Sequence, residues 1–160
     1  MEEYDRPVRL VAVVGPTAAG KSDLAMKLAE MLEGEIVGAD SRQVYRYLDI
    51  GTAKPSPADR TRVAHHLIDI VYPDEQFGLA SYLTLAKQSI TNTSISGKIP
   101  ILVGGTGQYI WALLEGWDVP RVPPDADSRK ALELQVEVSG VASVLHILEE
   151  IDPVAASRVD

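Results

Sequence analysis

Eight consecutive residues near the start of the chain have the spacing that phosphate binding requires. The segment 15–22 is GPTAAGKS, which matches the pattern G-x-x-x-x-G-K-[ST] at every fixed position. Its glycines let backbone N–H groups curl around phosphate oxygens, and the positive end of the following helix adds to the attraction. Lys21 would reach the terminal phosphates, and the Ser22 hydroxyl can bind Mg²⁺. The motif predicts a phosphate-binding loop made of Gly15, Pro16, Thr17, Ala18, Ala19, Gly20, Lys21 and Ser22.

The residues on either side of this loop predict the elements that hold it in place. Residues 9–14 form a short Val-rich apolar run, which is typical of a buried parallel strand. Residues 22–32 repeat apolar side chains at helical spacing, and Gly34 is expected to end that helix. The predicted buried face carries Leu24, Ala25, Leu28, Ala29 and Leu32. Residues 35–39 then form a second apolar run, so the segment as a whole predicts a strand–helix–strand unit.

An acidic residue stands where the second predicted strand ends. Asp40 follows EIVGA and precedes Ser41, Arg42 and Gln43. At the carboxyl edge of a parallel sheet, beside the phosphate loop, a carboxylate is well placed to act on a second substrate. The alternative is structural, because an aspartate at this position can also cap the helix that follows. Spacing alone leaves both interpretations open.

A glycine-rich segment follows another strong strand signal. Residues 98–103 (KIPILV) predict a strand, the sequence GGTGQY continues from Gly104, and residues 108–114 predict a helix. The glycines permit a close approach of the backbone to a ligand, and Thr106 offers a hydroxyl at the carboxyl edge of the sheet. A tight strand-to-helix turn without a ligand is the alternative for this segment.

The rest of the chain completes an α/β pattern. Residues 49–57 predict a loop, 65–71 a third strand and 79–91 a helix, and we interpret His65 and His66 as structural residues. A Pro-rich connector follows Gly116, then two helices at 128–138 and 141–150, and residues 152–160 lack a closing element. The fold predicted is a P-loop NTPase-like parallel sheet of about four strands flanked by helices. We expect an α/β core over 1–116 and the start of a helical insertion domain over 117–160.

Composition narrows the class of protein. The 160 residues carry a net charge of −8, which disfavours a simple nucleic-acid-binding domain. One basic stretch stands out, with Arg42, Arg46, Lys54, Arg60 and Arg62 against only Asp49 and Asp59. The absence of cysteine excludes disulfides and thiolate catalysis. No apolar run approaches the ~18 residues of a membrane span, so we expect a cytoplasmic enzyme without membrane contact.

Taken together, the motifs resemble a known family. The segments GPTAAGKS, ADSRQVY, DIGTAKP, HHLIDI and ILVGGTGQY, the last followed by ALLEG, stand in the order found in tRNA dimethylallyltransferases, also called tRNA isopentenyltransferases. The resemblance runs from about Val11 to the end of the chain. Members of that family continue well beyond this length, so we expect the chain to be the N-terminal part of such an enzyme.

The resemblance implies a reaction and a role for each motif. Such enzymes transfer the dimethylallyl group of dimethylallyl diphosphate to the N6 amine of the adenine 3′ of certain tRNA anticodons. It implies that the loop binds the diphosphate with Mg²⁺, that Asp40 is the general base, and that Thr106 contacts a flipped-out adenine. The residues implied to lie against tRNA are Asp40, Ser41, Arg42, Gln43, Thr106 and Arg129. The partners expected are tRNA and dimethylallyl diphosphate, and the protein is expected to be a monomer.

Two other functions stay open at this point. A small-molecule kinase of the P-loop type would use Asp40 to orient an acceptor hydroxyl. Such a kinase should have an arginine-rich lid, and the polar segment 91–97 (TNTSISG), which is best placed for one, contains no arginine. The chain could also be a diphosphate-binding module that lacks the rest of its catalytic machinery.

Overall fold

The computed structural model describes residues 9–120 and 125–159. The chain divides into two compact units, Met1–Pro120 and Arg121–Asp160, and each is described by itself. The division falls four residues beyond the predicted boundary at 116. The assignment of these parts as catalytic core and insertion domain stays a prediction.

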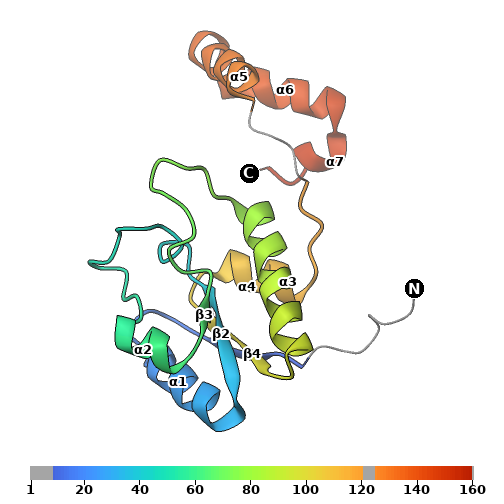
Figure 1. The fold of residues 1–160 in the computed structure, drawn as a ribbon. Helices are drawn as coiled ribbons and strands as arrows, with labels where there is room; N and C mark the ends of the chain where they lie inside the picture. Colours follow the sequence, from blue (N-terminus) through green and yellow to red (C-terminus); the bar gives the residue numbers. More distant parts are fainter. Residues whose placement is uncertain (1–8, 121–124, 160) are drawn as a thin grey trace. The chain divides into compact units, whose positions relative to one another are not determined.

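In the first unit, helices enclose a parallel sheet whose strand order is β1-β4-β2-β3 (Figure 1). The elements are β1 (Val11–Val14), α1 (Lys21–Leu32), β2 (Gly34–Ala39), α2 (Pro57–Arg62), β3 (His65–His66), α3 (Leu79–Ile95), β4 (Ile99–Gly104) and α4 (Gly107–Leu114). The predicted α/β fold is therefore confirmed. The two strands of the first strand–helix–strand unit, β1 and β2, are parallel, and β4 lies between them in the sheet.

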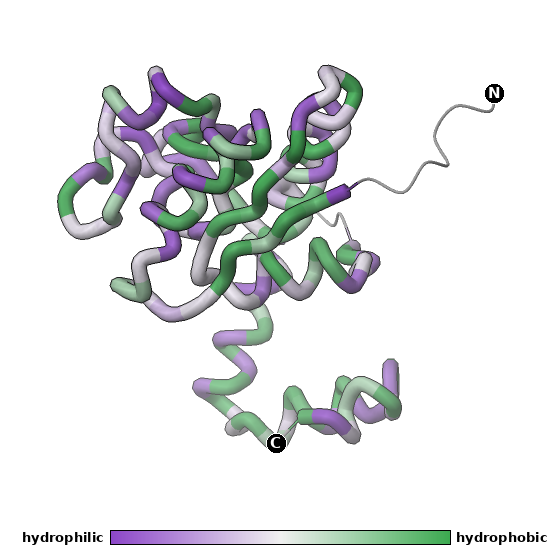
Figure 2. The backbone as a smooth tube through the Cα atoms, turned by 90° about the horizontal axis from the view of Figure 1, so that it is seen from below, coloured by the Kyte–Doolittle hydropathy of each residue, from purple (hydrophilic) through white to green (hydrophobic). Residues whose placement is uncertain are grey.

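Two separate apolar layers pack on the two faces of the sheet. On one face, Ala25 and Ala29 of α1 pack with Val13, Ile36 and Ile101 of three different strands. The opposite layer joins strand residues such as Val37 and Leu102 to α3 and α4, whose buried members include Tyr82, Leu83, Ala86, Tyr109 and Ile110. Figure 2 shows the hydrophobic residues following the strands through the interior of this unit. Burial of both faces explains why the strands are continuous apolar runs.

The buried face and the end of α1 both differ from the prediction. Small residues form the buried face, since Ala25 and Ala29 are buried whereas Leu24 and Leu32 are exposed. The helix is ended by Glu33, which adopts a left-handed conformation at φ 51°. Gly34 is instead the first residue of β2, where a Cβ would lie 2.6 Å from the carbonyl oxygen of Ile99. That glycine is therefore needed for strand packing and not for helix termination.

Two further element boundaries were predicted wrongly. The third strand contains only His65–His66 because Leu67 (φ 64°) and Asp69 (φ 55°) turn the backbone away from the extended conformation. Helix α3 continues to Ile95 and includes residues 91–95 of the segment considered above as a kinase lid. Thr93 in that part of the helix is buried, and its hydroxyl donates a 3.1 Å hydrogen bond to Glu35. The polar composition of this segment thus conceals a packed helical turn.

The second unit is helical. It contains α5 (Ala126–Ser139), α6 (Val141–Ile151) and α7 (Pro153–Ala156). The two predicted helices are confirmed, and the expectation that no element follows them is wrong, because Asp152 caps the short helix α7 through a bond from Ala155 N. Along residues 9–120 and 125–159, no helix is both long enough and apolar enough to cross a membrane.

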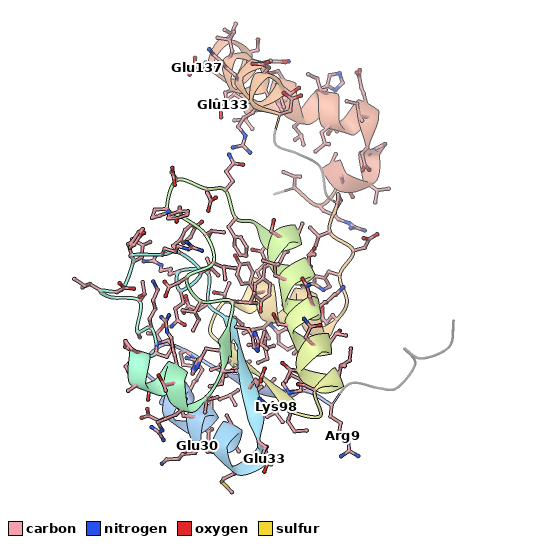
Figure 3. All side chains as sticks on the ribbon, viewed as in Figure 1. Arg9, Glu30, Glu33, Lys98, Glu133 and Glu137 are labelled. Atoms are coloured by element: carbon pink, nitrogen blue, oxygen red, sulfur yellow. The ribbon has the colours of Figure 1, made fainter. Side chains whose placement is uncertain are left out.

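A charged network joins the first residues of β2 to its neighbours, away from the strand ends that carry the motifs. Glu35 accepts hydrogen bonds from Lys98 Nζ (2.7 Å), His66 Nε2 (2.7 Å) and Thr93 Oγ1 (3.1 Å), and its side chain is 14% exposed. Figure 3 marks Lys98 at the start of β4. The hydrogen bond from Lys98 is the main cause that lowers the pKa of Glu35 to about 2. This network links β2, β3, α3 and Lys98, the residue before β4.

We expect Glu35→Gln to lower the free energy of unfolding by about 2 kcal/mol at neutral pH, because a charged acceptor of three hydrogen bonds is lost. The pKa of Glu35 is about 2 in the folded state and 4.5 unperturbed. Its contribution is therefore complete above about pH 4.5 and disappears as the pH falls toward 2. Urea unfolding of both proteins at pH 7, 4 and 3 measures this, and the difference between them should shrink with acidity. A difference that stays constant with pH would contradict it.

Candidate active site

The register of the sheet brings three motif segments to one edge. Val14 and Ala39 both pair with Gly104, so β1, β4 and β2 end level with one another. The residues that follow these strands are Gly15, Gly105 and Asp40. Parallel strands place their carboxyl ends together, which is where ligands bind in open α/β sheets. The predicted phosphate loop, acid and glycine-rich turn therefore meet at a single edge.

The phosphate loop has the conformation that its sequence predicts. Gly20 precedes α1 with φ 76°, and Ala18 is also left-handed with φ 66°. Lys21 is the first residue of α1, and its Nζ donates a 2.6 Å hydrogen bond to the carbonyl oxygen of Pro16 across the loop. The lysine ammonium is thereby held inside the loop, where the helix N-terminus also offers its unpaired N–H groups.

The last residue of β4, Gly104, and the next residue, Gly105, allow the chain to pass close to its neighbours. A Cβ on Gly104 would lie 2.1 Å from the carbonyl oxygen of Ala39, which no side chain tolerates. A Cβ on Gly105 would stand 3.2 Å from the carbonyl oxygen of Gly15 and 3.9 Å from Lys21 Nζ. The glycine-rich turn therefore lies directly against β2 and the phosphate loop.

These segments enclose a cleft with a volume of about 1060 Å³. The polar and glycine residues that line it include Thr17, Gly20, Lys21, Ser22, Asp40, Arg42, Gln43 and Lys54. Its apolar lining includes Ala25, Met26, Ile36, Ile68 and Val103. The cleft thus combines groups that bind phosphate with an apolar wall.

One oxygen of the Asp40 carboxylate has a structural task. Asp40 Oδ1 accepts hydrogen bonds from the backbone N–H groups of Arg42 (2.8 Å) and Gln43 (3.3 Å). It therefore caps a turn, as the structural interpretation required, although no helix follows. Oδ2 receives no hydrogen bond from the residues described. The two interpretations are thus compatible, since one oxygen orients the carboxylate and the other is available for chemistry.

Thr106 and Ser41 hold this acid against the glycine-rich turn. Thr106 Oγ1 accepts a 2.9 Å hydrogen bond from Ser41 N and lies 3.3 Å from Ser41 Oγ. In addition, Thr106 N donates to the carbonyl oxygen of Ala39 at 3.1 Å. Neither Thr106 nor Ser41 is among the described residues that line the cleft. The geometry gives Thr106 a positioning role, and its predicted contact with an adenine stays a prediction.

Gln43 supports a neighbouring loop. Its Nε2 donates hydrogen bonds to the carbonyl oxygens of Thr52 (2.9 Å) and Ala53 (3.1 Å). Residues 51–55 form one wall of the cleft. Both amide protons of Gln43 are therefore committed to this wall, which leaves its side-chain oxygen for other contacts.

A lysine with a buried side chain fixes the same wall. The sequence placed this residue, Lys54, in the basic stretch but did not indicate its burial. Lys54 is only 4% exposed, and its Nζ donates to Tyr45 O (2.6 Å), Asp49 Oδ1 (2.8 Å) and Asp69 Oδ1 (2.6 Å). Arg60 binds the second oxygen of Asp69 at 2.6 Å. Burial alone would raise the pKa of Asp69, but the hydrogen bonds from Lys54 and Arg60 lower it below its usual range. The only signal in the sequence was a lysine inside a Gly- and Pro-rich loop.

These pairs change the interpretation of the basic stretch. Lys54 and Arg60 are bound to aspartates, and Arg62 is bound to Glu30 and Asp59. Within the part of the chain that the structure describes, Arg42 and Arg46 have no carboxylate partner. The positive charge available to a ligand is therefore concentrated at the start of the stretch, beside the cleft.

His65 and His66 both have hydrogen-bond partners within the fold, and His65 also lines the cleft. His65 Nδ1 donates to the carbonyl oxygen of Val63 at 2.8 Å, and burial lowers its pKa. Over residues 9–120 and 125–159, no group of three or more acidic or histidine side chains could hold a metal ion. Mg²⁺ in a phosphate loop relies instead on a hydroxyl, phosphate oxygens and water. Ser22, which lines the cleft in the first turn of α1, fits that kind of site.

Comparison with known proteins identifies the family. The family model described as IPP transferase matches residues 43–160. The chain belongs to this family. A second model, isopentenyl transferase, matches residues 8–69 and covers the phosphate loop.

Relatives in the IPP transferase family are similar along nearly the whole chain. A tRNA dimethylallyltransferase from Roseiflexus castenholzii is 55% identical over 152 residues, which are 95% of this chain and 50% of the relative. A relative of the same name from Chloroflexus aurantiacus is 56% identical over 151 residues, or 94% of this chain and 51% of the relative. The chain thus spans about half the length of the curated relatives it matches.

Solved structures show the same similarity. The full-length tRNA isopentenylpyrophosphate transferase of Bacillus halodurans is 43% identical with a TM-score of 0.69, covering 96% of this chain and 51% of that structure. A eukaryotic dimethylallyltransferase described as acting on tRNA is 29% identical with a TM-score of 0.73, covering 95% of this chain and 38% of that one. The fold of this IPP transferase family member is therefore that of the tRNA isopentenyltransferases.

One predicted tRNA contact belongs to the second unit. Arg129 is exposed in the first half of α5, where it borders a shallow, mainly apolar surface with Leu132, Glu133, Val136 and Glu137. Figure 3 labels Glu133 and Glu137 on this helix. The role of Arg129 stays a prediction.

Proposed function

We propose that the cleft of the first unit binds dimethylallyl diphosphate and transfers its dimethylallyl group to the N6 amine of the adenine 3′ of a tRNA anticodon. One observation supports this above all: the phosphate loop and Asp40 line the same cleft, and one oxygen of that carboxylate has no hydrogen-bond partner among the described residues. The names of the relatives, which are tRNA dimethylallyltransferases, agree with this function.

In the binding step, the diphosphate lies against the backbone N–H groups of residues 17–22. Lys21 neutralises part of its charge, because a charge-assisted hydrogen bond to phosphate is about twice as strong as a neutral one. Ser22 would hold Mg²⁺, which would neutralise the charge that develops on the leaving diphosphate. The dimethylallyl chain fits the apolar side of the cleft, which includes Met26, Ile68 and Val103.

In the transfer step, a bond forms between N6 of adenine and C1 of the dimethylallyl group while the bond from C1 to the diphosphate oxygen breaks. The electron pair of that bond leaves with the diphosphate, and Lys21 stabilises the resulting charge. Asp40 Oδ2 accepts the proton that N6 loses. An exocyclic amine is a weak nucleophile, so removal of this proton as the bond forms assists the reaction.

The acceptor must enter from outside the cleft. A base in RNA reaches a buried site only after leaving its stack. Arg42 and Gln43 line the cleft next to Asp40, and Arg42 has no carboxylate partner among the described residues, so it is available to an RNA phosphate. Ser41 and Thr106 keep Asp40 in position, and Arg129 adds a contact from the second unit. We infer that the enzyme is cytoplasmic and acts as a monomer.

We expect dimethylallyl diphosphate to bind at least tenfold more tightly than ATP in the presence of Mg²⁺, a difference of about 1.4 kcal/mol. The apolar lining of the cleft provides a surface for the prenyl chain. Residues 91–95, in the segment best placed for a kinase lid, are instead part of α3. Calorimetry with both ligands measures the two affinities. ATP binding tenfold more tightly would favour a kinase and contradict the proposal.

A further inference from the structure

We propose that Tyr47 and Tyr72, supported by Arg46, form a platform on which an unpaired base of the RNA loop stacks beside the cleft. This inference rests on the proposed function, because it assumes that the acceptor is RNA. The platform lies outside the phosphate loop and the Asp40 turn. It belongs to the long segment between β2 and α2, which Figure 1 shows projecting from the first unit, and to the loop after β3.

The first argument is the strained backbone of Tyr47. Its φ is 64°, a left-handed conformation that glycine adopts freely and that is a genuine outlier for a bulky side chain. Such a conformation is unfavourable for an L-residue because its Cβ comes too close to the following carbonyl oxygen. Burial of the ring does not offset this, since Tyr47 is 74% exposed. An exposed aromatic ring on a left-handed backbone is therefore a candidate for contact with an external partner.

The second argument is that several contacts fix Arg46 and Tyr72, against which the Tyr47 ring lies. The ring centroids of Tyr47 and Tyr72 are 6.1 Å apart at an interplanar angle of 43°. Arg46 lies 4.6 Å from the centroid of Tyr72, donates to its hydroxyl at 3.0 Å and donates from Nε to Asp69 O at 2.9 Å. Backbone bonds also join Arg46 N to Val71 O at 2.8 Å. A base that stacks on Tyr47 would therefore lie beside a tyrosine and an arginine that are already held in place.

The third argument is chemical. Unpaired RNA bases are recognised by stacking on aromatic rings and on the planes of arginine guanidinium groups. Of the described residues in the basic stretch, only Arg42 and Arg46 lack a carboxylate partner, and both lie within five residues of Tyr47 in sequence. Lys54 connects this region to the cleft wall, because it binds the carbonyl oxygen of Tyr45. Positive charge and exposed rings therefore occur together in the segment that joins the Asp40 turn to the cleft wall at residues 51–55.

Three substitutions at Tyr47 test the platform, with an anticodon stem-loop RNA as the probe at low salt. Stacking on an aromatic side chain is worth about 1–3 kcal/mol per base, so Tyr47→Gly should weaken RNA binding by about 5- to 150-fold. Tyr47→Leu keeps an apolar side chain without the planar ring and should lose a similar amount. Tyr47→Phe should bind RNA within about twofold of the original protein. Because glycine relieves the strain, the melting temperature of Tyr47→Gly should be unchanged or higher.

Other outcomes would overturn the inference. Calorimetry with dimethylallyl diphosphate, carried out in parallel, distinguishes a failure of the platform from a failure of the proposed function. If Tyr47→Gly binds RNA as well as the original protein does, the platform is wrong and the proposed function stands. If the version of the chain extended to the length of its relatives binds diphosphate but no RNA, both fail. If Tyr47→Leu keeps full RNA affinity, the contact is not stacking. If the original protein dimerises and Tyr47→Gly does not, the exposed rings, with Leu48 and Ile50, serve a second copy of the chain.

Discussion

Asp40→Asn is expected to slow dimethylallyl transfer by about 10²–10⁴-fold, which is the usual contribution of a general base. Asparagine can still accept hydrogen bonds from Arg42 N and Gln43 N through its side-chain oxygen. The turn after β2 should therefore persist, and the affinity for dimethylallyl diphosphate should change little. The rate is measured in a version of the chain extended to the length of its relatives, with diphosphate affinity measured by calorimetry in parallel.

A matched control for this substitution is Asp74→Asn, which removes the same charge from an exposed position of the first unit. Its rate should equal that of the original protein. If Asp40→Asn instead lost diphosphate affinity and kept its rate of transfer, the carboxylate would be a ligand of the Mg²⁺ ion. The assignment of Asp40 as the base would then be wrong.

Lys21→Ala is expected to weaken the binding of dimethylallyl diphosphate by about 10²-fold. The lysine ammonium lies inside the phosphate loop, where its hydrogen bond to Pro16 O holds it at 2.6 Å. A hydrogen bond that involves a charged group contributes about 1.5–3 kcal/mol, and the upper part of that range corresponds to the expected loss. Calorimetry on this chain measures the effect without requiring turnover.

Lys87→Ala is the control, since Lys87 is exposed on α3 and its removal changes the net charge equally. Its diphosphate affinity should match that of the original protein. Equal losses in both variants would mean that the overall charge, and not the loop, determines binding. An unchanged affinity in Lys21→Ala would place the diphosphate elsewhere.

The sequence predicted the fold and the edge of the sheet that carries the site because both depend on local patterns. Apolar runs mark β1, β2 and β4, and glycines or acids mark their carboxyl ends. The errors arose where tertiary contacts override local preference. The third strand stops after His66 because Leu67 and Asp69 are left-handed, and Asp69 is held there by Lys54 and Arg60. No short-range pattern signals such a pair across fifteen residues.

The electrostatics of the site could be predicted only in part, because they too depend on tertiary contacts. A count of charges placed five cations between Arg42 and Arg62, but ion pairs with Asp69, Glu30 and Asp49 neutralise three of them. The sequence could present a capping role and a chemical role for Asp40 only as alternatives. The structure shows that one carboxylate oxygen caps the turn, and the proposed chemical role falls to the other oxygen.

Label transfer tests the central claim most directly. The extended version of the chain is incubated with dimethylallyl diphosphate labelled in its prenyl group and with an anticodon stem-loop RNA, and the labelled nucleoside is identified by mass spectrometry. The account predicts one labelled adenosine, 3′ of the anticodon, modified at N6, with diphosphate released in equal amount. Release of diphosphate without label in the RNA, or label on a small free acceptor in place of RNA, would contradict it.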